Sequence, residues 1–269
     1  MNHIYTEMEH EREKAFQSIW SNEIDAVFSD VAEYYDRANM YATLGLIETL
    51  RQRFLSTMDI NPGAKVLDVC AGTNVIGIDL LKKQPDLEVC AVDRCKAMQR
   101  VGRRLAEGQS LRIHSVISDV HELPFPDNHF DVVTLQWATR HLRALKVFSE
   151  IHRVLKPGGH FYHCDMLRPN VKLVEKVYCF YLKICLRLIS RAFGSGSTAL
   201  GCRGYFVDAI RMFYSVAELS SALSELGFSD VVGRPVLAGT VGFHAARKSS
   251  RWDGHVTRAS DASDPTSGG

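Results

Sequence analysis

A glycine-containing turn between two apolar segments holds the residues whose spacing is most typical of a nucleotide site. Residues 66–69 form a short apolar run, as in a buried parallel strand, and residues 75–81 have the apolar spacing of a helix. Between them, Gly72, Asn74 and Gly77 have the spacing of G-x-G-x-x-G, with asparagine in place of the middle glycine. Asparagine tolerates a positive φ, so the turn can form and present free N–H groups to a ligand. An ordinary strand-to-helix turn is the alternative interpretation, because this motif alone is weak.

An acidic residue at the end of the next apolar segment favours the nucleotide interpretation. Residues 87–92 predict a second strand, and Asp93 follows it, 25 residues after Asp68. At this place in an α/β fold, an acid accepts hydrogen bonds from two ribose hydroxyls. Sites for NAD and sites for S-adenosylmethionine (SAM) both use such an acid, so these residues leave the cofactor open.

The composition is that of a soluble globular protein. Of the 269 residues, 46% are hydrophobic and 23% are charged, and the net charge of +1 gives no case for nucleic acid as a partner. The seven cysteines include no C-x-x-C pair, so neither a zinc site nor a disulfide framework is indicated. Reduced thiols and an N-terminal segment without an apolar core favour a cytoplasmic location.

Strands and helices alternate along the chain beyond the glycine turn. Further strands are predicted over residues 112–118, 130–137 and 160–165, with helices over 97–106 and 145–155. This alternation predicts a doubly wound α/β domain, in which ligands bind at the carboxyl ends of the strands.

The ends of the chain are expected to differ from its middle. Residues 1–22 are predicted to be a polar, partly helical leader, residues 23–248 the folded domain, and residues 249–269 a disordered tail. Inside the domain, two helices are predicted before the sheet and an antiparallel strand pair at its edge. These elements are expected over residues 24–35, 44–54, 229–236 and 240–246.

Residues 171–193 combine basic and apolar positions at helical spacing. The charges exclude a membrane-spanning helix. One interpretation is a helix that covers the core, and the other is a basic interfacial helix that contacts lipid headgroups and admits a hydrophobic substrate. The basic stripe consists of Lys172, Lys176, Lys183, Arg187 and Arg191.

Several segments resemble those of known methyltransferases. Residues 119–133 (DVHELPFPDNHFDVV) resemble the LPFxDxxFDxV segment of class I SAM-dependent methyltransferases, and residues 153–159 (RVLKPGG) match a turn of the same enzymes. An F-x-x-V-A-x-x-Y-D-x-x-N segment from Phe28 to Asn39, with G-F-x-x-V and G-x-V-x-x-H-x-x-x-K-like segments near the end, narrows the resemblance to the UbiE/MenG quinone methyltransferases. The similarity covers about residues 28–248.

The resemblance implies an α/β class I methyltransferase (Rossmann-like) fold, with a seven-strand sheet and an N-terminal helical cap, and SAM as the cofactor. It implies that Asp93 binds the ribose, Asp119 and Val120 the adenine, and Gly72 the methionine part. The other cofactor-binding candidates are residues of the turn and of the strand ends, namely Asp68, Asn74, Arg94 and Gln136.

A divalent metal is not indicated by spacing. His163, Cys164 and Asp165 are ligand types at a strand end, but strand alternation sends neighbouring side chains to opposite faces.

The resemblance also identifies candidate catalytic residues and one departure from the family. The family has G-T-G-D where this chain has GTNV at 72–75, so an acid is replaced by Val75. In the quinone methyltransferases that acid is implied to help a tyrosine and an arginine remove a ring proton, and these are retained as Tyr35 and Arg140. Arginine is a poor base without its carboxylate. His141 is therefore a candidate base near neutral pH, with a surface position at a helix start as the alternative.

Because the acid is lost, two different reactions are compatible with the sequence. The preferred interpretation is rhodoquinone formation, as in the RquA branch of the family, where amino replaces a methoxy group of ubiquinone with SAM as participant and no ring proton leaves. The alternatives are C-methylation of a demethylated quinone, as in UbiE/MenG, and a pseudoenzyme that binds SAM or lipid in a quinone-biosynthesis complex. In the two enzymatic interpretations the partner is a polyprenyl quinone substrate. The expected location is the cytoplasm, with peripheral attachment to the inner membrane as a further possibility. The oligomeric state is left open.

Overall fold

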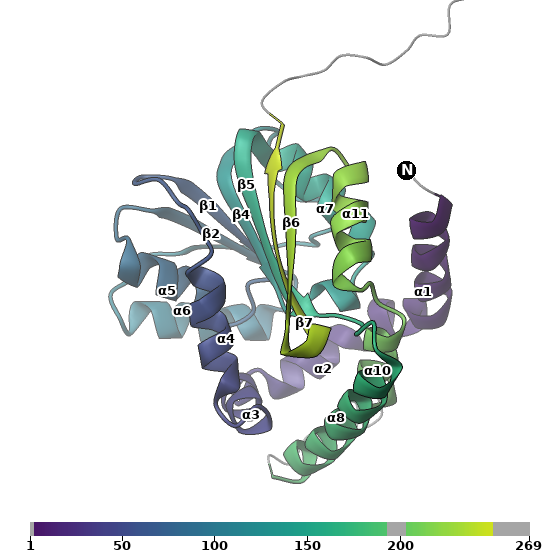
Figure 1. The fold of residues 1–269 in the computed structure, drawn as a ribbon. Helices are drawn as coiled ribbons and strands as arrows, with labels where there is room; N and C mark the ends of the chain where they lie inside the picture. The colour runs from purple at the N-terminus through teal and green to yellow at the C-terminus, as the bar shows by residue number, and fades with distance from the viewer. Residues whose placement is uncertain (1–2, 193–202, 250–269) are drawn as a thin grey trace, which may run out of the picture.

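A mixed sheet of seven strands forms the centre of the molecule (Figure 1). The computed structural model describes residues 3–192 and 203–249. The strands are β1 (Lys65–Val69), β2 (Glu88–Asp93), β3 (His114–Ile117), β4 (Phe130–Gln136), β5 (Leu155–Met166), β6 (Phe228–Val236) and β7 (Val241–Lys248). They lie in the order β3-β2-β1-β4-β5-β7-β6, and β7 runs antiparallel to both of its neighbours. The predicted seven-strand α/β sheet and its antiparallel pair are confirmed.

Helices cover both faces of the sheet, because each central strand is buried on both sides. One face carries α7 (Ala144–Val154) and α11 (Val216–Glu225), and the other carries α4 (Leu46–Leu55) and α5 (Val75–Lys83). A fifth helix, α6 (Lys96–Glu107), packs beside β2 and β3.

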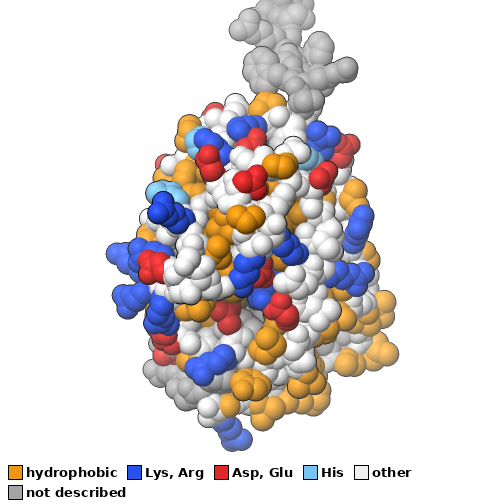
Figure 2. Space-filling view, turned by 90° about the vertical axis from the view of Figure 1, so that its left-hand side faces the viewer, with side chains coloured by type: hydrophobic (Ala, Val, Ile, Leu, Met, Phe, Trp, Pro, Cys, Tyr) orange, Lys and Arg blue, Asp and Glu red, His pale blue; other side chains and the backbone are white. Residues whose placement is uncertain are grey.

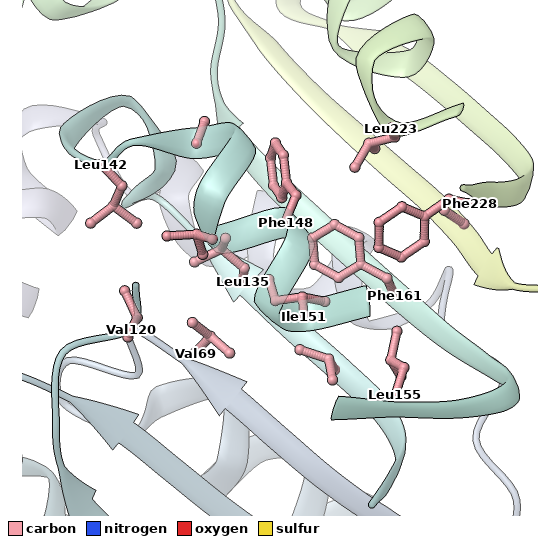
Figure 3. Packing of buried hydrophobic residues seen from close by; sticks show 14 of the residues in the cluster. Val69, Val120, Leu135, Leu142, Phe148, Ile151, Leu155, Phe161, Leu223 and Phe228 are labelled. Atoms are coloured by element: carbon pink, nitrogen blue, oxygen red, sulfur yellow. The ribbon is translucent and has the colours of Figure 1, made fainter. Parts of the chain in front are cut away.

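Alternation along β1 divides its side chains between the two sides. Leu67 belongs to the cluster under α7 and α11, whereas Val66 belongs to the cluster under α4 and α5. In the first cluster the ring of Phe161 lies between those of Phe148 and Phe228, at centroid distances of 5.7 and 5.6 Å (Figure 3). This packing fixes the strands whose carboxyl ends carry the polar residues.

The remaining helices form a cap at the end of the sheet where those carboxyl ends lie (Figure 1). They are α1 (His3–Asn22), α2 (Ile24–Val31), α3 (Tyr35–Ala42), α8 (Lys172–Ala192) and α10 (Arg203–Arg211), with a short 3-10 turn, η1 (Thr139–His141), beneath them. The N-terminal helical cap expected from the resemblance is therefore present, and α8 and α10 extend it.

One sequence-based expectation about the cap is wrong. The single helix predicted over residues 24–35 is broken into α2 and α3, and Phe28 and Tyr35 meet edge to face at 6.2 Å. The segment predicted to be a polar, partly helical leader contains the helix α1, whose Tyr5, Arg12 and Trp20 are buried. The boundary predicted between this segment and the folded domain stays a prediction. The tail predicted over residues 249–269 lies outside the described residues except for Ser249, and so does the glycine- and serine-rich segment 194–197, which the sequence predicts to be a loop.

Candidate cofactor and substrate site

Two adjoining cavities lie between the cap and the carboxyl ends of the strands. The first, here called the turn cavity, is lined by the glycine turn, the end of β2 and residues 136–138. The second, here called the apolar cavity, is lined mainly by hydrophobic side chains of α2, α3, α8 and α10. Five residues line both cavities and mark where they join, namely Phe28, Tyr35, Asn39, Ile47 and Trp137.

The glycine turn has the backbone conformation that its sequence predicts. Gly72 and Asn74 have φ values of +52° and +61°, and Asn74 precedes the first residue of α5. The amide of Gln99 donates to Asn74 Oδ1 at 2.8 Å and to the Gly72 carbonyl at 3.0 Å. Gly72 lines the turn cavity, whereas Asn74 is buried, is held by Gln99 of α6, and is not among the lining residues.

Asp93 faces the turn cavity at the end of β2. Its two carboxylate oxygens each accept a backbone hydrogen bond at 2.8 Å, one from Gly72 and one from Cys95. Burial raises the pKa of Asp93, and these hydrogen bonds oppose that rise. Because a carboxylate oxygen accepts more than one hydrogen bond, the side chain can hold the turn and still accept from ribose hydroxyls.

Arg94 and Gln136 also line the turn cavity, with different surroundings. Arg94 pairs with Asp25 of α2 at 2.6 Å, so it ties the cap to the end of β2. The buried Gln136 Oε1 has no hydrogen-bond partner among the described residues. A buried acceptor of this kind is expected to receive a hydrogen bond from a ligand donor, and the ammonium group of SAM would supply one.

Four of the candidate cofactor residues do not line either cavity, namely Asn74, described above, and Asp68, Asp119 and Val120. Asp68 is buried under the turn, accepts from the Thr134 hydroxyl at 2.7 Å, and has its pKa raised to about 7 by burial. Val120 belongs to the hydrophobic cluster under α7 (Figure 3). The carboxylate of Asp119 is half exposed and accepts from the backbone N–H of His121 at 2.9 Å. The adenine roles of Asp119 and Val120 therefore stay predictions.

Arg140 retains a carboxylate partner, which the sequence analysis did not anticipate. It is buried beside the apolar cavity, forms an ion pair with Asp165 at the end of β5, and donates to the Trp137 carbonyl at 2.7 Å. Burial alone would lower the pKa of Arg140, but Asp165 and Tyr35 raise it. The guanidinium is thus a fixed cation and hydrogen-bond donor rather than a base.

The two other candidate catalytic residues lie close to Arg140. Burial raises the pKa of Tyr35, so its phenol stays protonated at neutral pH. His141 is 5% exposed and lines the turn cavity, so the predicted alternative of a surface residue is wrong. Burial, with Arg140 and Arg12 nearby, lowers its pKa well below the usual value, and its Nε2 has no partner among the described residues.

Asp36, an acidic residue of the cap, belongs to the Y-D-x-x-N part of the motif that ends at Asn39. Asp36 lines the turn cavity, and the Thr73 hydroxyl donates to its Oδ1 at 3.1 Å. Glu48 and Arg51 also line the turn cavity and pair with each other. The signal that could have identified Asp36 is its place directly after Tyr35 at the start of a helix.

Residues 3–192 and 203–249 are the described ranges in which a metal site or a membrane-spanning helix could be seen. Within these ranges no group of three or more His, Cys, Asp or Glu side chains could hold a metal ion. His163 instead contacts Thr139 and His244, at 2.8 and 3.2 Å. No helix in the described part of the chain is both long and apolar enough to cross a bilayer.

The fold has counterparts among solved structures. A possible histamine N-methyltransferase of Thermotoga maritima superimposes with a TM-score of 0.59, at 15% identity, over 83% of this chain and 98% of that one. A phosphoethanolamine N-methyltransferase of Haemonchus contortus, solved with S-adenosyl-L-methionine, gives 0.55 at 16% identity, over 75% of this chain and 52% of that one. These likenesses place the chain in the class I methyltransferase fold.

Sequence comparison then identifies the family. The model of the ubiE/COQ5 methyltransferase family matches residues 16–248, and the chain belongs to this family. It is 32% identical over 227 residues to a demethylmenaquinone methyltransferase of Corynebacterium glutamicum, covering 84% of this chain and 94% of that one. The corresponding protein of Symbiobacterium thermophilum is 30% identical over 228 residues, or 82% and 91% of the two chains. The chain is thus a SAM-dependent methyltransferase, as the resemblance implied.

Proposed function

We propose that the chain transfers a methyl group from SAM to a ring carbon of a reduced polyprenyl quinone. The observation that carries this proposal is the junction of the two cavities at Tyr35, Asn39 and Trp137. The turn cavity has the polar residues that a nucleoside cofactor needs, and the apolar cavity suits a flat ring with a prenyl tail. The demethylmenaquinone methyltransferases of other species support a substrate with an unsubstituted ring carbon.

In the turn cavity, the side chains hold the cofactor so that it faces the junction. Asp93 accepts from the ribose hydroxyls, and Gln136 Oε1 accepts from the amine of the methionine part. Bound SAM supplies an electrophilic methyl group. The apolar walls exclude water, so that the methyl group meets the ring carbon rather than a water molecule.

The polar end of the apolar cavity orients the ring. Arg140, held by Asp165, and the phenol of Tyr35 are donors that can hydrogen-bond the ring oxygens. Donation to a ring oxygen fixes which carbon faces the turn cavity. Tyr178 lines the same end, and burial raises its pKa, so it too remains a donor.

Rhodoquinone formation, which the sequence analysis preferred, is the second candidate. The observation in its favour is Val75, an apolar residue in the wall of the turn cavity where the family has an acid. Amination of ubiquinone releases methoxide and needs no base for a ring proton. C-methylation has more support, because the similar curated proteins are methyltransferases and because Arg140 keeps a carboxylate partner.

We also propose that the enzyme works peripherally at a membrane, where such a substrate resides. The helix α8 lines the apolar cavity with Tyr178, Leu182 and Leu186, while its outer face is exposed. Hydrophobic side chains gather at the lower end of the molecule in Figure 2, the end where α3 and α8 lie in Figure 1. Exposed apolar residues of α8 are Leu173, Val177, Phe180, Tyr181, Ile184 and Leu188. Apolar and basic side chains on one helix suit an anionic lipid surface.

Quinone analysis in a bacterial host distinguishes the two reactions. The host lacks its own quinone C-methyltransferase and accumulates demethylated quinones, and it makes no rhodoquinone. If the proposal is right, expression of the chain yields a quinone one methyl group heavier than the precursor. Amination is tested in a second host, which produces ubiquinone. C-methylation would be overturned if this second host made a quinone with amino in place of methoxy and the first host made no methylated product.

A further inference from the structure

We propose that Asp36 accepts the ring proton released during methyl transfer, in place of the family acid that Val75 replaces. The inference rests on the proposed C-methylation, because that reaction leaves a proton on the methylated ring carbon. Asp36 lies on α3 directly after Tyr35, and both residues line the turn cavity.

Elimination among the cavity carboxylates singles out Asp36. The described residues that line the apolar cavity include no carboxylate, and those of the turn cavity include Asp25, Asp36, Glu48 and Asp93. Asp25 is paired with Arg94 and Glu48 with Arg51. Asp93 is engaged by two backbone N–H groups. Among these four, Asp36 is the carboxylate without an ion pair or a backbone donor in the described part of the chain.

The position of Asp36 places it near the junction of the cavities. Tyr35, one residue before it, and Asn39, three residues after it, line both cavities. Residues three apart on a helix share a face, so Asp36 and Asn39 point the same way. Thr73, which donates to Asp36 Oδ1, stands two residues before Val75 in the glycine turn. Asp36 on α3 therefore lines the same cavity as Val75, the position of the missing acid at the start of α5.

The surroundings of Asp36 suit a base that must also release its proton. Burial raises the pKa of Asp36, while the Thr73 hydroxyl and the charge of Arg51 limit the rise. The other titratable and charged groups that line this cavity are Asp25, Tyr35, Glu48, Arg51, Cys70, Asp93, Arg94 and His141. Arg51 is held by Glu48 and by Asp79 at 2.8 Å, so it acts on Asp36 from a distance.

The proton balance of the step is complete with Asp36 in this role. The ring carbon forms a bond to the methyl carbon as the bond from that carbon to the SAM sulfur breaks. The C–H bond at the same ring carbon then breaks, its electron pair restores the aromatic ring, and the proton goes to Oδ2 of Asp36. Asp36 later releases this proton to solvent, so the reaction yields the methylated quinol, the thioether and one proton.

A deuterium experiment on Asp36→Asn tests the assignment. The probe is reduced demethylmenaquinone with a short prenyl tail, prepared with hydrogen or deuterium at the reactive ring carbon, and methyl transfer is followed at saturating SAM. Loss of a general base is expected to slow the reaction by about 10²–10⁴-fold. Because proton removal then limits the rate, the deuterated substrate reacts more slowly than the protonated one, and by a larger ratio than with the parent protein. SAM affinity, measured by calorimetry, stays unchanged.

Two further variants and three outcomes complete the test. Asp36→Glu is expected to recover part of the rate, and Asp86→Asn, which removes an exposed acid far from the cavities, leaves the rate and isotope effect unchanged. Weaker SAM binding by Asp36→Asn with full rate at saturation would make Asp36 a cofactor ligand and overturn the proposal. A slower rate with the parent's isotope effect would reduce it to a positioning residue. No methylation by the parent protein would overturn the proposed function itself, and the assignment with it.

Discussion

Asp93 supports the glycine turn and faces the turn cavity, so its structural role and its proposed cofactor role must be separated by substitution. Asp93→Asn keeps the shape of the side chain but removes the charge that strengthens hydrogen bonds from ribose hydroxyls. We expect SAM affinity to fall by about 1.5–3 kcal/mol, roughly tenfold to over a hundredfold, measured by calorimetry. The melting temperature without SAM reports damage to the turn separately. Equal affinity in the variant and the parent would remove Asp93 from the cofactor site.

Val75 decides between the two candidate reactions, because Val75→Asp restores the acid of the family. If the enzyme methylates a ring carbon, the variant is expected to be as active as the parent or more active, because the turn cavity then holds a second carboxylate in addition to Asp36. If it aminates ubiquinone, the carboxylate favours the protonated, non-nucleophilic amine, and product disappears. Mass spectrometry of host quinones measures both outcomes. Loss of methylated product would contradict the first expectation.

The sequence placed several residues correctly around the cavities, and the reasons are local. Gly72, Asp93 and Gln136 lie at a turn or a strand end, and parallel strands bring such ends to one edge of the sheet. The pairing of Arg140 with Asp165 is different, because it joins two strand ends 25 positions apart through side-chain geometry. No spacing rule predicts that contact.

At the scale of elements, α8 is where the sequence left two interpretations open. One side of α8 lines the apolar cavity and the other is exposed, so the helix does more than cover the core. Its contact with lipid headgroups stays a prediction, since hydrophobic spacing alone does not say what the exposed side meets. The strands were predicted more closely, because burial on both faces leaves a continuous apolar run.

The exposed basic side chains of α8 are expected to contribute to lipid binding. Lys183→Gln with Arg187→Gln should weaken binding to anionic vesicles by about 1 kcal/mol per removed charge, as measured by co-sedimentation at low salt. A matched control, Lys82→Gln with Lys83→Gln, removes two exposed charges from α5 on another part of the molecule. Equal loss in both double variants would mean that binding depends on net charge and not on α8.

Helix α1 is attached to the site by a buried arginine. Arg12 donates to the carbonyls of Arg140 and Leu142, at 2.9 and 3.2 Å, and its guanidinium lies 4.7 Å from the ring of Phe213. Arg12→Met leaves those carbonyls without this donor and Glu9 without its ion-pair partner, so we expect a loss of about 3–5 kcal/mol in the free energy of unfolding. Denaturant titration measures it. A loss below about 1 kcal/mol would mean that α1 is attached mainly by its apolar residues.

At the scale of the whole molecule, buried histidines make stability depend on pH. His163 and His244 lie side by side between β5 and β7, and His244 Nε2 is 3.1 Å from the Val216 carbonyl at the start of α11. The contact of His163 with Thr139 extends this chain of polar groups to η1, which carries Arg140 and His141. The same buried groups thus join the sheet, α11 and the site.

Protonation of His244 should therefore weaken the whole fold. Burial lowers its pKa from 6.5 to about 4, so between these values the unfolded chain binds a proton that the folded chain does not. The free energy of unfolding then falls as the pH is lowered, by about 1.4 kcal/mol per pH unit for this residue. Asp68 acts in the opposite direction, because its pKa is raised to about 7 in the folded state.

The difference between the parent and His244→Gln isolates the contribution of His244, since Asp68 is common to both. Denaturant titrations between pH 7 and pH 4.5 should give a smaller loss of stability in the variant as the pH falls. The variant is expected to be less stable than the parent at pH 7, where glutamine replaces a well-packed ring, and the two curves should converge toward acid pH. Parallel curves would mean that His244 is protonated equally in the folded and unfolded states, and the low pKa assigned to its burial would be wrong.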